Sequence, residues 1–96
     1  MSSYTVRVEL HRASDTDYEN LHSAMEEAGF VRWIKGDNQR FRLPTAEYNL
    51  PNSSLGKEAV RDKAKAATNS VKPRPEPWIL VTPTEGRIWS GLPLWH

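Results

Sequence analysis

The sequence predicts a small α+β domain in which one antiparallel sheet carries two helices on a single face. Three observations predict this class: strict apolar and polar alternation near the start of the chain, two segments with apolar residues at helical spacing, and further strand-like segments between and after them. The order along the chain is βαββαβ. Two right-handed crossovers in that order give the ferredoxin-like arrangement, a four-stranded antiparallel sheet with both helices on one face. We treat residues 1–96 as one such domain, with a core over about 4–83 and a C-terminal extension over 84–96.

The first strand and the first helix have the clearest patterns. The segment YTVRVELH (4–11) alternates strictly and is predicted to be a strand. Its apolar face consists of Tyr4, Val6, Val8 and Leu10. The next segment predicts a helix over about 15–28, because Ser14 or Asp15 can cap its start, apolar residues follow at helical spacing, and Gly29 can end it.

Residues 30–50 predict two strands joined by a turn. FVRWIK (30–35) is a short strand, GDNQ (36–39) is a turn, and RFRLPTAEYNL (40–50) returns as the hairpin partner. In the returning segment the alternation resumes with opposite parity after Pro44. Because a bulge inserts one residue and shifts the facing parity by one, we predict one central strand with a bulge at Pro44. The alternative is a strand that ends at Leu43.

A second helix and a last strand complete the order. The buried stripe of that alanine-rich helix consists of Val60, Ala64, Ala67 and Val71, at spacings of four, three and four. KPRPEP (72–77) ends the helix, because its three prolines cannot continue an α-helix. WILVT (78–82) is the fourth strand, and GRIWSGL (86–92) is a candidate for a short fifth one.

The composition indicates a globular protein rather than a disordered or fibrous one, with 38% hydrophobic and 26% charged residues. The chain has no cysteine, which excludes disulfides, thiolate nucleophiles and cysteine-ligated zinc. The start has no basic region followed by an apolar run, and the longest aliphatic or aromatic run is WILV. We therefore expect a cytoplasmic protein with no membrane partner.

The net charge is only +1, but the charges are unevenly placed. Residues 13–29 carry acidic side chains and no lysine or arginine, whereas residues 30–43 and 57–74 are mainly basic. This distribution predicts one acidic and one basic surface. Lys57, Arg61 and Lys65 recur at every fourth position of the second helix, a stripe that suits either a nucleic-acid backbone or an ordinary solvated helix face.

The polar face of the central strands is the main candidate site. Arg7 from the first strand would lie beside Arg40 and Arg42 from the third, and these arginines could grip phosphates. The predicted RNA-binding set consists of Arg7, Arg40, Arg42, Arg32 and Lys35. The other interpretation is cross-strand ion pairing, in which acidic neighbours on the same face neutralise the arginines.

His11, which follows Glu9 on this face, is the candidate catalytic acid or base. Its unperturbed pKa of about 6.5 allows proton exchange near neutral pH. Asp15 and Asp17 are close to His11 in sequence, but the spacing matches no defined metal loop, and capping explains acidic residues in a first helical turn. We therefore expect no metal and no other cofactor.

The tryptophans allow two interpretations. Trp33, Trp78 and Trp89 could stack on bases, or they could close the core or an interface. In the C-terminal extension, the strand-like pattern around Ile88 and Trp89 predicts an interface in a homodimer. The alternative is that this segment folds back over its own domain.

Five stretches, YTVRVELH, DYENLH, RLPTAEY, ILVT and WSGL, together resemble a family of small bacterial and prophage proteins that is grouped with the GhoS-type antitoxin endoribonucleases. The resemblance spans about residues 4–91. It implies a ferredoxin-like fold similar to the small CRISPR-associated adaptation nuclease, and a toxin-antitoxin antitoxin that cleaves the messenger RNA of a membrane-damaging toxin. The adaptation nucleases have an aspartate at the end of the first strand, where this chain has ELHR, so a metal-dependent mechanism of that kind is not expected. No catalytic residue of the family is matched to a position here.

Two functional hypotheses follow. The first is an RNA-binding protein with candidate endoribonuclease activity on messenger RNA. The second is a non-catalytic protein interaction module of bacterial or prophage origin, which would use an exposed edge strand and the tryptophan-bearing C-terminal segment.

Overall fold

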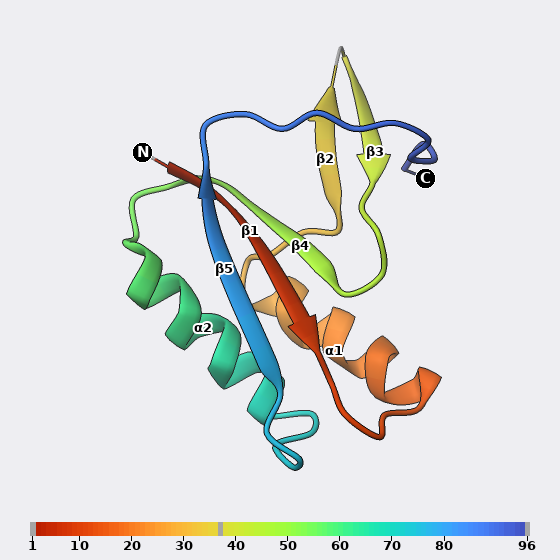
Figure 1. Ribbon diagram of the computed structural model, residues 1–96, viewed down its shortest axis with the longest axis vertical. Helices are drawn as coiled ribbons and strands as arrows, with labels where there is room; N and C mark the ends of the chain where they lie inside the picture. The colour runs from red at the N-terminus through yellow and green to blue at the C-terminus, as the bar shows by residue number, and fades with distance from the viewer. Residues whose placement is uncertain (1, 37, 96) are drawn as a thin grey trace.

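The computed structural model describes residues 2–36 and 38–95 and confirms the α+β class (Figure 1). The elements are β1 (Ser2–Glu9), α1 (Asp15–Glu27), β2 (Trp33–Gly36), β3 (Gln39–Arg42), β4 (Glu47–Ser53), α2 (Lys57–Asn69) and β5 (Trp78–Thr84). β1, β4 and β5 form a three-stranded antiparallel sheet in the order β4-β1-β5, and β2 and β3 form a separate hairpin. No helix of the described part is long and apolar enough to cross a membrane.

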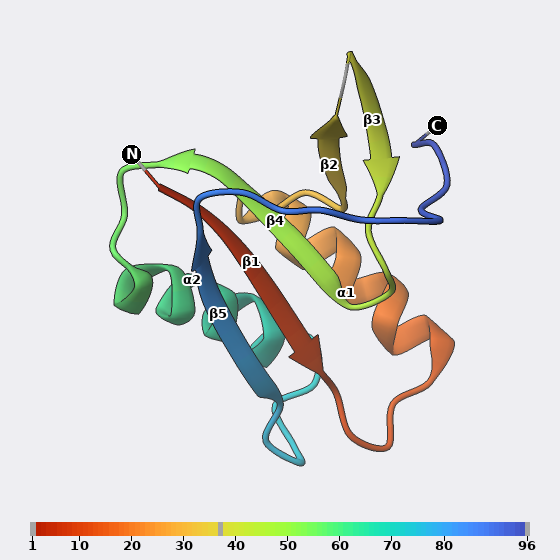
Figure 2. The same ribbon diagram turned by 45° about the horizontal axis from the view of Figure 1, so that its top comes forward.

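Both helices cover one face of the three-stranded sheet (Figures 1 and 2), and the core lies between them and β1. The predicted inward face of β1 is confirmed, since Val6 and Val8 are fully buried. The largest fully buried side chains are Tyr48, Phe30, Leu21, Met25, Val6, Val8, Val60 and Thr68. The opposite face of the sheet carries no helix, and we call it the open face.

α1 begins where the sequence indicates. The Ser14 hydroxyl accepts the Asp17 backbone N–H at 3.1 Å, and the Asp17 carboxylate accepts the Ser14 N–H at 3.0 Å. This reciprocal capping satisfies two N–H groups that have no partner within the helix. Asp17 thus has a capping role, and no group of three or more potential metal-ligating side chains occurs in the described part of the chain.

The predicted bulged strand over residues 40–50 is wrong, because the segment forms two strands in different sheets. β3 ends at Arg42 and β4 begins at Glu47, so Pro44 lies in the loop between them. Ala46 in this loop has φ of 68°, and the Glu47 N–H donates to the Pro44 carbonyl at 3.1 Å. The parity changes because the chain leaves the hairpin and joins the sheet. The alternative of a strand that ends near Leu43 is the one observed.

The described sheet has three strands rather than the predicted four. After α1 the chain makes one antiparallel bridge to β4, between Val31 and Asn49, and then leaves the sheet as β2. β2 pairs instead with β3, from Trp33↔Arg42 to Gly36↔Gln39. A hairpin partner a few residues away costs little loop entropy, and Asn38, with φ of 62°, accepts the left-handed conformation that tight turns favour.

The C-terminal extension folds back over its own domain, crosses the open face and reaches the hairpin (Figures 1 and 2). The stretch GRIWSGL forms no strand in the described structure, so the predicted fifth strand is wrong there. The backbone of this extension pairs with β3 only after this stretch, at residues 93–95. The Arg42 N–H donates to the Pro93 carbonyl at 2.8 Å and the Trp95 N–H donates to the Arg40 carbonyl at 2.9 Å. We call residues 85–95 the tail.

Candidate nucleic-acid interface

The hairpin register brings three cationic side chains and one tryptophan to the same face. Trp33 lies opposite Arg42, and Lys35 lies opposite Arg40. Directly opposed residues of an antiparallel pair share a face, and residues two apart on a strand do too. We call the surface formed by Trp33, Lys35, Arg40 and Arg42 the hairpin cation face.

The geometry of this face combines exposed charge with an aromatic platform. The Arg40 guanidinium carbon lies 4.2 Å from the centroid of the Trp33 ring, a cation–π contact. Lys35, Arg40 and Arg42 are exposed, while Trp33 is half-buried. The ion pairs found among the described residues, His11 with Glu9 and Arg61 with Asp62, include none of these cations. The charges of Lys35, Arg40 and Arg42 are therefore exposed to solvent and accessible to a ligand.

The tail adds a second tryptophan beside this face. The bridge between Phe41 and Leu94 aligns the tail antiparallel to β3, and the hydrogen bond from Trp95 to Arg40 places these two residues opposite each other. By register, Trp95 belongs to the same face as Arg40. Two indoles and three cations thus meet on one side of the hairpin.

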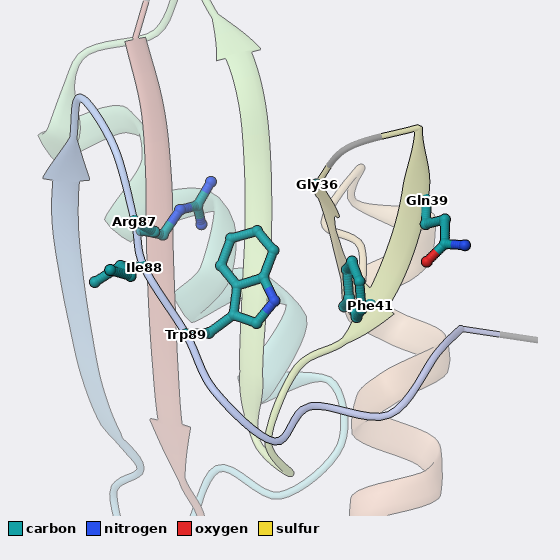
Figure 3. A pocket seen from close by; sticks show the side chains of 6 residues that line it. All are labelled: Gly36, Gln39, Phe41, Arg87, Ile88 and Trp89. Atoms are coloured by element: carbon teal, nitrogen blue, oxygen red, sulfur yellow. The ribbon is translucent and has the colours of Figure 1, made fainter.

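The opposite face of the hairpin is apolar and is held by the tail. Ile34 is buried, and Phe41 contacts Trp89, with ring centroids 5.6 Å apart. A depression of about 430 Å³ lies here, lined by Gly36, Gln39, Phe41, Arg87, Ile88 and Trp89. Figure 3 shows Trp89 pointing from the tail toward the hairpin and Ile88 pointing the other way. Trp89 is half-buried inside its own domain, whereas Ile88 is 97% exposed.

Arg87 ties the tail to the open face. Its guanidinium donates to the Thr5 hydroxyl at 2.9 Å and to the Asn49 side-chain oxygen at 2.8 Å, and the Asn49 amide donates to the Trp33 carbonyl at 3.2 Å. Burial lowers the pKa of Arg87 below its usual value. One chain of hydrogen bonds thus connects tail, sheet and hairpin.

Arg7 does not join the hairpin arginines. It is exposed on the open face of β1, opposite Glu47 on β4 and Leu80 on β5. Arg40 and Arg42 belong to the other sheet, and so the predicted convergence of three arginines on adjacent central strands is wrong. The reason is that the segment after Pro44, not the one before it, pairs with β1.

His11 follows the C-terminal end of β1, and this end of the strand points away from the hairpin (Figure 1). Its Nδ1 is 3.8 Å from a Glu9 carboxylate oxygen, and its ring meets Trp78 edge-on, with centroids 4.6 Å apart. Its Nε2 is buried and has no hydrogen-bond partner in the described structure. A nitrogen enclosed in this way is poorly placed to exchange a proton with a bound substrate.

Arg32 precedes β2 and belongs to a polar cluster at the base of the hairpin. His22 Nδ1 and the Tyr48 hydroxyl are 2.6 Å apart, and the Tyr48 side chain is fully buried. Burial, and secondarily the nearby Arg32 charge, lower the pKa of His22, while burial raises the pKa of Tyr48. Arg32 is only partly exposed and its Nε is buried, so it contributes less to a binding surface than Lys35 does.

The sequence reasoning missed the anchoring roles of Arg87, Asn49 and Gly36. A Cβ on Gly36 would lie 2.9 Å from Trp89 Cζ2, so only glycine allows this close approach. Asn49 occupies a polar position of the alternation over residues 46–50, so the strand pattern gave no sign that it is buried. Comparison with protein-family models, curated proteins and solved structures found no match.

Proposed function

We propose that this protein binds single-stranded RNA through the hairpin cation face. The observation that carries the proposal is the packing of Arg40 over Trp33, on a face that also carries Lys35 and Arg42. The hydrogen bond from Trp95 to Arg40 adds Trp95 to this face by register. Cations hold the phosphates of a flexible strand while indole rings stack on its bases, and the combination tolerates any sequence. A duplex keeps its bases stacked inside and would leave the tryptophans unused.

RNA binding, which the family resemblance implies, is thus proposed for the hairpin cation face instead of the open face. The ferredoxin-like element order remains our interpretation of the topology: β1, β4 and β5 occupy the places of the first, third and fourth strands, and the Val31 bridge marks where the second would lie. The antitoxin and messenger RNA roles rest on the resemblance alone.

Fluorescence anisotropy with a labelled single-stranded RNA of mixed sequence tests the binding proposal. The logarithm of affinity should fall with the logarithm of salt concentration by about 0.7 per contacted phosphate, hence by about 2 if three cations are engaged. Arg42→Ala should reduce the magnitude of this slope by about 0.7, the value expected for one contacted phosphate.

Arg7→Ala is the matched control, because it removes an exposed strand arginine from the other sheet. The proposal predicts little change in the salt slope for this variant. A slope lowered equally by Arg7→Ala would return the site to the open face, and salt-independent or absent binding would refute RNA recognition. Equal affinity for DNA of the same sequence would show that the single strand, not the ribose, is recognised.

Cleavage is a separate proposal, and His11 is its only named candidate. Incubation of labelled RNA with the protein, with and without a chelator, tests for it. Because Nε2 of His11 is buried, Nδ1, 3.8 Å from a Glu9 carboxylate oxygen, is the nitrogen that would have to exchange the proton. Full cleavage by His11→Ala would eliminate this residue, and cleavage lost only with chelator would point to a metal-dependent site elsewhere.

Of the two residues expected at a homodimer interface, Ile88 is the one that stays available, because Trp89 packs against the hairpin of its own chain. Sedimentation of the full chain and of a chain truncated after Thr84 tests it. A larger mass for the full chain alone would support the dimer, and monomers in both cases would rule it out.

A further inference from the structure

The outer edge of β5 is free of backbone partners in the described structure. β5 pairs with β1 from Ser3↔Thr84 to Glu9↔Trp78, and no other strand lies beyond it. Proline within a strand occurs where its missing N–H would face away from the neighbouring strand. Pro83 therefore places the backbone groups of Ile79 and Val81, which share its parity, on the outer edge. These residues can pair with an added strand, whereas Pro83 limits how far the pairing extends.

One side of this edge carries exposed apolar side chains. On the open face, Trp78 is 67% exposed and Leu80 is 63% exposed. Ile88, 97% exposed, follows on the tail and points away from the hairpin (Figure 3). A row of large apolar side chains along an unpaired strand edge is unusual for a monomeric surface, because it invites pairing with another chain.

The other side of the edge is lined by two cations, Arg61 and Lys65, and one carboxylate, Glu76. A groove of about 180 Å³ between β5 and α2 is lined by Arg61, Lys65, Asn69, Glu76, Pro77 and Ile79. Arg61 is paired with Asp62, with 3.0 Å between charged atoms, so Lys65 is the lining cation whose charge is least committed. A strand added to β5 would direct alternate side chains toward this groove and toward the apolar row.

We propose that β5 accepts an extended peptide segment of a partner protein, in which acidic residues alternate with apolar ones. The apolar side chains would pack on Trp78 and Leu80, and the acidic ones would face Lys65 and Arg61. This is strand addition, in which backbone hydrogen bonds give affinity and alternate side chains give specificity. The surface is distinct from the hairpin cation face, so the proposal stands independently of RNA binding.

The charges favour this occupant over two others. A second copy paired through β5 would place two α2 stripes of Lys57, Arg61 and Lys65 side by side, and the like charges would repel. RNA would meet the apolar row in a depression where Glu9 lies beside Arg7 and offsets its charge. An acidic and apolar peptide meets complementary groups on both sides.

The test uses a labelled, end-blocked decapeptide that alternates valine and glutamate, with an alternating valine and lysine peptide as its counterpart. The full chain should bind the glutamate peptide at micromolar to millimolar concentration and bind the lysine peptide at least about fivefold more weakly. Binding should slow amide exchange at Ile79 and Val81, because their N–H groups gain partners.

Two charge-reversed variants of α2 form a matched pair. Lys65→Glu lies in the groove, whereas Lys63→Glu makes the same charge change about 160° away around the helix. Lys65→Glu should weaken the glutamate peptide by about fivefold and strengthen the lysine peptide, and Lys63→Glu should change neither by more than about twofold. Leu80→Lys, at an exposed position, should weaken the glutamate peptide further.

Several results would overturn the proposal. They are equal binding of both peptides, no binding of the glutamate peptide at about 1 mM, or equal effects of the Lys63 and Lys65 variants. Self-association abolished by Leu80→Lys would assign the edge to a second copy. Protection of Ile79 and Val81 by single-stranded RNA would assign it to nucleic acid.

Discussion

The three-stranded sheet and the hairpin have similar alternating sequences but are held in place by different means. β1 lies between two strands and under two helices, so its apolar side chains enter a shared core. The hairpin has only one strand-to-strand ladder, and its apolar residues meet a few side chains of the tail. Alternation alone therefore does not predict how stable a strand is. Its stability depends on the strands and helices that pack against it.

The difference also separates stability from candidate function. Most of the buried apolar residues lie in the sheet and helices, whereas the cations on the hairpin are exposed and can contact a ligand. Elements with few buried contacts open at lower free energy than the core. A recognition surface on the hairpin can thus adapt to its ligand without loosening the fold.

The largest expected effect lies in the core. Leu21→Ala should lower the free energy of unfolding by about 2–5 kcal/mol, because it leaves a cavity between α1 and the sheet. Urea denaturation measures this. The control is Leu80→Ala, which truncates an exposed leucine and should cost less than about 0.5 kcal/mol. Equal losses of unfolding free energy would contradict the assignment of Leu21 to the core and of Leu80 to the exposed face of the sheet.

The contact between the tail and the hairpin should be sensitive to one methyl group. Gly36→Ala forces Trp89 to move, and we expect a loss of about 1–2 kcal/mol with faster amide exchange at Arg42 and Trp95. Exchange in β1 should stay slow. Gly86→Ala is the control on the tail itself, because nothing lies within 4 Å of its added Cβ. If both variants behave alike, Trp89 does not anchor the tail.

The cluster at the base of the hairpin should make stability depend on pH. The folded-state pKa of His22 lies below its ordinary value, so the unfolded chain binds more protons when the medium is acidified. The stabilising contribution is complete above the unfolded pKa of about 6.5 and is lost as pH falls through the folded pKa. His22→Gln should make the decline of unfolding free energy below about pH 6.5 shallower. An unchanged slope would remove His22 as the cause.

The smallest effect is expected at the loop that separates the two sheets. Pro44 is exposed and its carbonyl accepts the Glu47 N–H, a bond that alanine can also accept. Pro44→Ala should cost about 0.4–1 kcal/mol, through the greater freedom of the unfolded chain. Val8→Ala, in the buried face of β1, should cost more, about 1–3 kcal/mol. The reverse order would mean that the loop, not the core, determines stability.

The local elements and their buried faces could be predicted from the amino-acid sequence. The alternation of β1 predicted which of its side chains are buried, and the spacing of Val60, Ala64 and Ala67 predicted the inner face of α2. Val71, the fourth residue of the predicted stripe, lies beyond the end of α2 and is half-buried. Ser14 and Gly29 bracketed α1 to within about one or two residues. These features follow from contacts between residues that are close along the chain. Lys35, Arg40 and Arg42 were candidates from the sequence, and the hairpin register of the structure places them on one face.

Which strands pair, and which segments cover them, depends on tertiary contacts that the strand patterns do not specify. Residues before and after Pro44 belong to different sheets, so Arg7 was separated from Arg40 and Arg42. The contacts of Arg87 with Thr5 and Asn49, and of Trp89 with Gly36, join residues far apart in the sequence. A strand pattern tells which side chains share a face, but many partners satisfy the same backbone groups. The choice among partners depends on loop closure and on packing summed over the whole chain.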